Sequence, residues 1–136
     1  MSNRLMLFIP TYSCQQQILR VLSEIDKNVQ NYIDEVVIID NRSRDNTINE
    51  AILASEGILK RLTILRNNQN YNLGGSIKHA FIYALKNNYD YMITLHGDDQ
   101  ADIRDLLPVF QNGQYKKMTL LLEQGSIKNQ LFKATL

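Results

Sequence analysis

Four short apolar runs recur along the chain, and each of them ends at polar residues. The runs are Leu5–Ile9, Val36–Ile39, Leu62–Leu65 and Tyr91–Leu95. The first two runs are uninterrupted, and the last two each contain one threonine, a residue that favours strands. Apolar runs of this length are typical of strands that are buried on both faces of a parallel sheet. We expect Pro10 to end the first strand, because proline has no amide hydrogen to donate to a neighbouring strand.

Apolar residues recur at helical spacing between these runs. The spacing predicts helices over 15–28, 47–59 and 73–87, and a short helix over 102–110 in which Pro108 is a flaw. Regular alternation of strands and helices predicts an α/β fold, with a mostly parallel sheet and helices on both faces. Residues 114–136 show no clear period. We therefore expect one folded domain over 1–113 and a tail of uncertain structure over 114–136.

Composition excludes several classes of protein. The 136 residues carry a net charge of +1 and 44% apolar residues, which fits one globular domain with no attraction to nucleic acid. The single cysteine, Cys14, cannot form an internal disulfide, so a reducing compartment and a buried structural thiol are expected. No stretch reaches the ~20 apolar residues of a membrane-spanning helix. We expect a soluble cytoplasmic protein, or one held peripherally at the inner face of the membrane.

Polar side chains follow three of the predicted strands. They are Thr11-Tyr12, Asp40-Asn41 and His96-Gly97-Asp98-Asp99. The carboxyl ends of parallel strands lie at one edge of a sheet, where such folds bind their ligands. Each group alone is also an ordinary turn, but three at successive strand ends favour a site.

The acidic turn is the strongest single signal. Carboxylates on a short turn suit Mg²⁺ or Mn²⁺, which usually accompanies phosphate. His96 either completes a metal or phosphate site with Asp98 or hydrogen-bonds to the backbone of the turn. Asp40 can accept hydrogen bonds from a nucleobase or ribose, and Tyr12 can pack on a base.

A glycine pair, Gly74-Gly75, begins the third predicted helix. A helix start attracts anions, and close packing explains the glycines equally well. The neighbouring Lys78 is expected to be solvated. His79 is expected to be a surface or partly buried residue rather than a ligand.

Four segments taken in order resemble the N-terminal half of the family 2 glycosyltransferases, which have an inverting mechanism and a GT-A fold. The segments are Phe8–Tyr12, Val36–Thr47, Asn72–Ser76 and Leu95–Gln100, within a resemblance that covers about residues 5–110. The nearest type transfers a sugar from a nucleotide to a polyprenyl phosphate. The resemblance implies a Rossmann-like nucleotide-sugar-binding domain that uses Mg²⁺ or Mn²⁺ and a UDP- or GDP-sugar. It implies a polyprenyl phosphate or a cell-surface glycan as the acceptor.

The resemblance also implies roles for individual residues. Asp98 takes the place of the second aspartate of the family's D-x-D metal motif, and His96 stands where the first aspartate usually is. Asp99 follows the motif and stabilises the turn. The implied donor-binding residues are Pro10, Thr11, Tyr12, Asp40, Asn41 and Asp98, and the implied metal ligands are Asp98 and His96.

The acceptor-binding half of the family has no visible counterpart here. That half carries the general base, and no residue of the tail, including Glu123, lies in a recognisable version of its motif. We expect a truncated or frame-altered member that binds a nucleotide sugar better than it turns it over.

Two other functions remain open. A catalytically incomplete donor-binding fragment or regulatory binding module is favoured by the missing base. A nucleotidyltransferase is disfavoured, because it should carry a glycine-rich basic loop after the first strand, and Thr11–Gln15 has none.

Overall fold

The computed structural model describes residues 3–117, 120–122 and 130–133. The strands are β1 (Leu5–Thr11), β2 (Glu35–Asp40), β3 (Leu62–Arg66), β4 (Tyr91–Thr94), β5 (Leu120–Leu122) and β6 (Gln130–Lys133). The α-helices are α1 (Ile18–Ser23), α2 (Lys27–Gln30), α3 (Thr47–Ser55), α4 (Asn72–Lys86) and α5 (Leu107–Gln111), and the 3₁₀ helices are η1 (Ile103–Leu106) and η2 (Gln114–Lys117).

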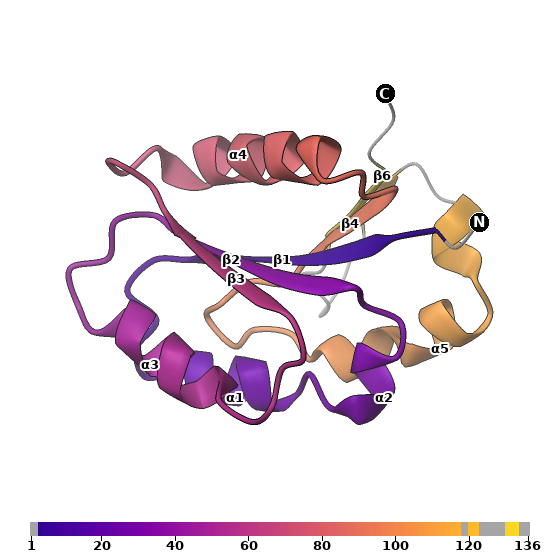
Figure 1. Cartoon of the computed structure of the whole chain (residues 1–136), viewed down its shortest axis with the longest axis horizontal. Coiled ribbons are helices and arrows are strands. Elements are labelled where there is room, and N and C mark those ends of the chain that lie inside the picture. Colours follow the sequence, from indigo (N-terminus) through magenta and orange to yellow (C-terminus); the bar gives the residue numbers. More distant parts are fainter. Residues whose placement is uncertain (1–2, 118–119, 123–129, 134–136) are drawn as a thin grey trace.

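The strands form one sheet in the order β3-β2-β1-β4-β6-β5. The first four strands run parallel, while β6 is antiparallel to both β4 and β5. Helix α4 covers one face of the sheet, and α1, α2, α3 and α5 cover the other (Figure 1). This arrangement confirms the predicted α/β fold with a mostly parallel sheet and helices on both faces.

The central strand β1 contributes to both halves of the core. Leu5, Leu7 and Ile9 belong to the cluster that contains the buried apolar residues of α1 and α3. Met6 and Phe8 belong to the cluster that contains Ala80 and Ala84 of α4. Because successive residues of a strand point to opposite faces, a continuous apolar run is what a strand covered on both sides requires.

The expectation that Pro10 ends the first strand is wrong. Strand β1 continues to Thr11, and Pro10 lies opposite Ile39 of β2. The Pro10 carbonyl accepts a hydrogen bond from the Gly97 amide at 3.2 Å, so this residue turns its polar groups toward the β4 side. The missing proline amide therefore takes nothing from the pairing with β2, in which the Thr11 carbonyl accepts from the Asn41 amide at 2.9 Å.

The first predicted helix is two helices in the structure. Helix α1 ends at Ser23, and Asp26 begins α2 by accepting a hydrogen bond from the Val29 amide at 3.0 Å. A local cap thus restarts the helix where the apolar spacing predicts continuity. Pro108 is not a flaw either, because it lies in the first turn of α5, where no intrahelical donor is needed.

Two strands come from the predicted tail. Strand β6 pairs with β4, and β5 pairs with β6. The rest of the tail beyond residue 117, including Glu123, lies outside the described residues, and the domain boundary at 113 stays a prediction. Within the described ranges, no helix is both long and apolar enough to cross a lipid bilayer.

Candidate functional site

A cavity of about 330 Å³ opens at the carboxyl ends of the parallel strands. Four chain segments supply its walls, namely the ends of β1, β2 and β4 and the start of α4. The lining residues are Pro10, Thr11, Tyr12, Cys14, Asn41, Asn70, Asn72, Leu73, Ser76, His96, Gly97 and Asp98. Six of the predicted site residues lie among them: Pro10, Thr11, Tyr12, Asn41, His96 and Asp98. Asp40 does not line the cavity, and the roles of all these residues stay predictions.

The end of β4 approaches β1 very closely at Gly97. The Leu95 amide donates to the Phe8 carbonyl at 2.9 Å, and the Gly97 amide donates to the Pro10 carbonyl at 3.2 Å. A β-carbon at Gly97 would lie 2.9 Å from Thr11 Cγ2 and 3.0 Å from the Pro10 carbonyl oxygen. A β-carbon would force the Thr11 side chain or the Pro10 backbone to shift, so glycine permits this close approach of the β1 and β4 walls.

The acidic turn divides its two carboxylates between two tasks. Asp99, in the left-handed region at a φ of 61°, forms an ion pair with Arg20 of α1 in which Nε and Oδ2 are 2.6 Å apart. Asp98 is exposed at the cavity, and His96 is half-buried there. The turn is therefore tied to α1 through Asp99, while Asp98 faces the cavity.

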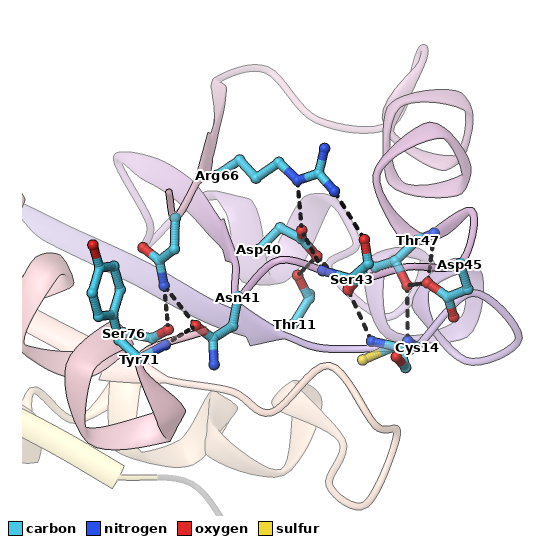
Figure 2. Close-up of polar contacts among 12 residues, drawn as sticks. Thr11, Cys14, Asp40, Asn41, Ser43, Asp45, Thr47, Arg66, Tyr71 and Ser76 are labelled. Carbon is cyan, nitrogen blue, oxygen red and sulfur yellow. Dashed lines mark hydrogen bonds and ion pairs between the residues drawn. The ribbon is translucent and has the colours of Figure 1, made fainter. Parts of the chain in front are cut away.

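Asp40 is fully buried and organises the loop that follows β2. Its carboxylate accepts hydrogen bonds from the Ser43 amide at 3.0 Å and from the Ser43 hydroxyl at 2.5 Å, and its Oδ2 lies 3.5 Å from Arg66 Nε (Figure 2). The Thr11 hydroxyl also donates to it, at 3.3 Å. Asp40 therefore faces donors of the protein itself, and the implied contact with a base is not part of this geometry.

The loop after β2 is fastened to the loop after β1. The Ser13 amide donates to the Ser43 hydroxyl at 2.9 Å, and the Cys14 amide donates to the Thr47 hydroxyl at 2.9 Å (Figure 2). Asp45 accepts hydrogen bonds from both the amide and the hydroxyl of Thr47. These contacts join the β1 and β2 walls of the cavity into one polar scaffold.

Cys14 lies at the base of this scaffold and is buried. Burial raises the pKa of its thiol, and the nearby carboxylate of Asp98 raises that pKa further. Sγ also exchanges hydrogen bonds with the amide and carbonyl of Tyr12, both at 3.3 Å. A protonated, hydrogen-bonded thiol agrees with the structural role expected from the sequence.

Side-chain amides build the wall on the α4 side. Asn41 accepts hydrogen bonds from Asn67 Nδ2 and from the Tyr71 amide, both at 2.9 Å (Figure 2). Its own Nδ2 donates to Asn70 Oδ1 at 2.8 Å. Asn67 Nδ2 also donates to the Ser76 hydroxyl at 3.0 Å. Sequence reasoning missed Asn70, Asn72 and Ser76, although the density of asparagine between β3 and α4 is a visible signal.

The glycine pair at the start of α4 has a packing explanation. A β-carbon at Gly75 would lie 2.3 Å from Tyr71 Cβ, whereas one at Gly74 would meet nothing within 4 Å. Gly75 therefore accommodates the turn that leads into the helix. Neither glycine lines the cavity, so the anion-binding explanation gains no support from the geometry.

The protein supplies few donors for a metal ion. Among the described residues, no group of three His, Cys, Asp or Glu side chains is placed to hold one. Two side chains that line the cavity could bind a metal ion and are not fully buried. They are His96, which is half-buried, and Asp98, which is exposed. Mg²⁺ and related ions are commonly held by one or two side chains together with substrate phosphates. The donor set fits an ion that arrives with a phosphate ligand.

The sequence profile of glycosyl transferase family 2 matches residues 6–115. By sequence, the chain matches no curated protein. Several solved structures share its fold at low sequence identity, and three of them are compared with this chain in the next paragraph.

TarS from S. aureus, in complex with UDP-GlcNAc, aligns with a TM-score of 0.69 and 19% identity over 88% of this chain and 33% of that one. The mannosyltransferase PcManGT from Pyrobaculum calidifontis, in complex with GDP-Man and Mn²⁺, aligns with a TM-score of 0.65 and 17% identity over 98% and 45%. Glucosyl-3-phosphoglycerate synthase from Mycobacterium tuberculosis, in complex with Mn²⁺, UDP and glucosyl-3-phosphoglycerate, gives 0.57 and 13% over 71% and 34%. The chain thus spans between one third and one half of the length of these proteins.

Proposed function

The chain belongs to glycosyl transferase family 2, and from that premise we propose that its cavity binds the nucleoside diphosphate of a sugar donor. The observation that carries the proposal is the composition of the cavity walls. Asp98 and His96 stand at the end of β4, while Thr11, Tyr12 and Asn41 stand at the ends of β1 and β2. Asp98 and His96 beside aromatic and amide side chains suit a ligand with a diphosphate at one end and a base at the other.

The nucleoside end of the cavity is assigned to the wall between β1 and α4. Tyr12 is 51% exposed and Leu73 is 45% exposed, so both offer apolar surface that a base can cover. Asn41 offers an amide hydrogen in the same wall. In this assignment Pro10 and Thr11 shape the floor, and Asp40 acts by holding the loop of Ser43 rather than by touching the ligand.

The diphosphate end is assigned to His96 and Asp98, which would hold Mg²⁺ or Mn²⁺ together with the phosphates. When bound, such an ion neutralises the charge that builds up on a departing diphosphate. An imidazole in the donor set favours Mn²⁺ over Mg²⁺, because Mg²⁺ prefers oxygen ligands more strongly. Gly97 and the Arg20–Asp99 ion pair keep the two donors at the cavity.

The reaction we propose is transfer of the sugar from the nucleotide to an acceptor, either a polyprenyl phosphate or a cell-surface glycan. A glycan hydroxyl needs a base to remove its proton, whereas a phosphate acceptor is already ionised. The resemblance to polyprenyl-phosphate enzymes favours the phosphate, and we propose that the reaction takes place at the inner face of the membrane.

Calorimetric titration of the protein with UDP and with GDP, each with and without Mn²⁺, tests this proposal. We expect one of the two nucleotides to bind and the ion to strengthen binding by at least about tenfold, the scale of one or two charge-assisted contacts. The Asp98→Asn variant should bind the nucleotide as the wild type does without the ion and lose the gain from Mn²⁺. Binding of neither nucleotide would refute the proposal.

A donor-binding module without turnover is the second candidate. The observation that favours it is that, among the described residues that line the cavity, Asp98 is the one carboxylate, so no second acid stands there to act as a base. Release of free nucleotide from the sugar donor, measured with and without a polyprenyl phosphate, separates the two. Acceptor-dependent release supports the transferase, and binding without release supports the module.

A further inference from the structure

His79 lies outside the cavity described above and is joined to it by two side-chain amides. Its Nδ1 is 2.8 Å from Asn67 Oδ1, and Asn67 Nδ2 is 2.9 Å from Asn41 Oδ1. His79 also lines a separate cavity of about 330 Å³ beside the edge strand β3, and its ring meets the Tyr71 ring edge-on at 5.2 Å. The histidine is half-buried, and Asn67 lies between it and Asn41, which lines the first cavity.

The orientation of every amide in this chain of contacts is fixed by backbone groups. The Tyr71 amide can only donate, so the Asn41 atom 2.9 Å from it is the oxygen. The Asn72 amide donates to Asn70 Oδ1 at 2.8 Å, which makes Asn41 Nδ2 the donor to that same oxygen. Two independent N–H groups therefore impose one orientation on Asn41.

The same logic extends to the histidine. Because Asn41 Oδ1 accepts from Asn67, the Asn67 atom that faces it is the nitrogen, and the atom that faces His79 is the oxygen. An oxygen without hydrogen can only accept, so Nδ1 of His79 carries the hydrogen. Asn67 is 6% exposed, and without that hydrogen its carbonyl oxygen would be buried and unpaired.

One hydrogen of Asn41 is left for a ligand. Its oxygen accepts two hydrogen bonds, and one of the two Nδ2 hydrogens is given to Asn70. Asn41 therefore offers the cavity a donor and no ready acceptor, so it suits a carbonyl oxygen and opposes an amino group. Uracil carries a carbonyl where cytosine carries an amino group, and guanine carries a carbonyl where adenine carries an amino group.

We propose that His79, as its Nδ1–H tautomer, is a positioning residue that holds Asn67 and Asn41 so that the cavity selects a nucleobase carbonyl. The inference deepens the proposed function and rests on it for its binding readout. His79 acts through Asn67 and does not touch the ligand.

Two matched variants test the donor at His79. In His79→Asn, the amide nitrogen lies at the same δ position as Nδ1 and can restore the hydrogen bond to Asn67. In His79→Gln, the amide lies one atom further out and mimics Nε2 instead. Asparagine and histidine have similar helix propensities, and melting temperatures are measured for both variants to compare their stability.

Base selectivity is the ratio of the dissociation constants for CDP and UDP, or for ADP and GDP, each measured by titration. We expect the wild type to prefer the carbonyl base by about tenfold, the value of one well-made hydrogen bond to a base edge. His79→Gln should lower this preference to about twofold, and His79→Asn should keep it. A His79→Gln variant with wild-type selectivity overturns the proposal, as does loss of selectivity in both variants.

A second measurement needs no ligand. The chain has two histidines, His79 and His96, so a long-range ¹H–¹⁵N spectrum of the wild type can be assigned with the His96→Gln variant. We expect His79 to carry its hydrogen on Nδ1 at neutral pH, and a hydrogen on Nε2 alone overturns the proposal. If the wild type binds no nucleotide, the proposed function and the selectivity of Asn41 fail, while the spectrum still decides the tautomer.

Discussion

The two ends of β2 carry the same chemical group in two different settings. Glu35 begins the strand and Asp40 ends it, and the residues are 3% and 0% exposed. Each carboxylate has hydroxyl donors, and each has an arginine within ion-pair distance. Arg61 Nε lies 3.9 Å from Glu35, and Arg66 Nε lies 3.5 Å from Asp40.

The two carboxylates differ in where their donors come from. Glu35 accepts from Thr63 of β3 at 2.6 Å, from Tyr83 of α4 at 3.0 Å, and from Tyr89 before β4. Asp40 accepts from Ser43 in the adjoining loop and from Thr11 at the end of β1. A buried carboxylate stabilises whatever supplies its donors, so Glu35 holds elements together and Asp40 holds the loops of the cavity.

The largest effect on stability is expected when the side chain of Glu35, at the amino end of β2, is truncated. Glu35→Ala leaves three hydroxyls without their acceptor and creates a cavity between α4 and the sheet. We expect the free energy of unfolding to fall by about 3–5 kcal/mol in a urea titration. Nucleotide affinity of the folded fraction should change by no more than about twofold, because the site lies at the other end of the strand.

Tyr83→Phe is the control for this change. It removes one of the three hydroxyls and keeps the ring, so the cost should be about 1 kcal/mol. A Glu35→Ala protein as stable as the wild type would mean that the hydroxyls find other acceptors, and the comparison between the two ends would fail.

The close approach of β4 to β1 gives the next effect. Gly97→Ala forces a β-carbon against Thr11 and the Pro10 carbonyl, which should cost about 1–3 kcal/mol of stability by overpacking. We also expect nucleotide affinity in the presence of Mn²⁺ to drop by at least about tenfold, since the turn of Asp98 must move.

Gly74→Ala is the matched control at the start of α4. A β-carbon there meets nothing within 4 Å, and alanine in a helix should raise stability by about 0.5–1 kcal/mol. Equal losses of affinity in the two variants would contradict the assignment of the β4 turn to the site.

A pair of isosteric changes compares the two ends directly. Asp40→Asn places an amide nitrogen among donors, so the loop of Ser43 should loosen and nucleotide affinity should fall by about tenfold, or ~1.4 kcal/mol. Glu35→Gln makes the same change at the amino end and should leave the affinity unaltered. Calorimetry on both variants measures the difference, and the comparison breaks if Glu35→Gln weakens binding as much as Asp40→Asn.

Acid should produce the smallest effect, and we expect it through Glu35 at the amino end of β2. Burial raises the pKa of Glu35, but hydrogen bonds from Thr63, Tyr89 and Tyr83 outweigh it, and the pKa lies below its ordinary value. A lowered pKa contributes stability that is present above the unfolded value, about 4.3, and is lost as the pH falls through the folded value. The free energy of unfolding, measured from pH 6 to pH 3, should fall more steeply for wild type than for Glu35→Gln.

The sequence predicts those features that depend on local pattern. Apolar runs locate all four parallel strands, and strand direction alone brings Thr11, Asn41 and Asp98 to one edge. Asp26 shows the limit of this reasoning, because one capping side chain interrupts a helix whose apolar spacing continues. The spacing of apolar residues does not predict a helix boundary that depends on a single hydrogen bond.

The buried polar clusters are invisible for another reason. Glu35 finds Thr63, Tyr83 and Tyr89 at separations of 28, 48 and 54 residues, and His79 finds Asn67 at 12. No local motif marks such pairs, since each partner looks like an ordinary polar residue in its own segment. The packing of α4 and of the segment before β4 against β2 brings these residues together.

The order of strands in the sheet also determines when each part of the sheet can form during translation. β4 inserts beside β1, the first strand made, and not beside β3, which precedes it in the chain. A nascent chain can pair β1, β2 and β3 early, yet the wall that carries Asp98 forms only after the fourth strand has emerged. Ligand recognition therefore arises later in translation than the pairing of β1, β2 and β3, and a chain released before the fourth strand would lack the wall that carries Asp98.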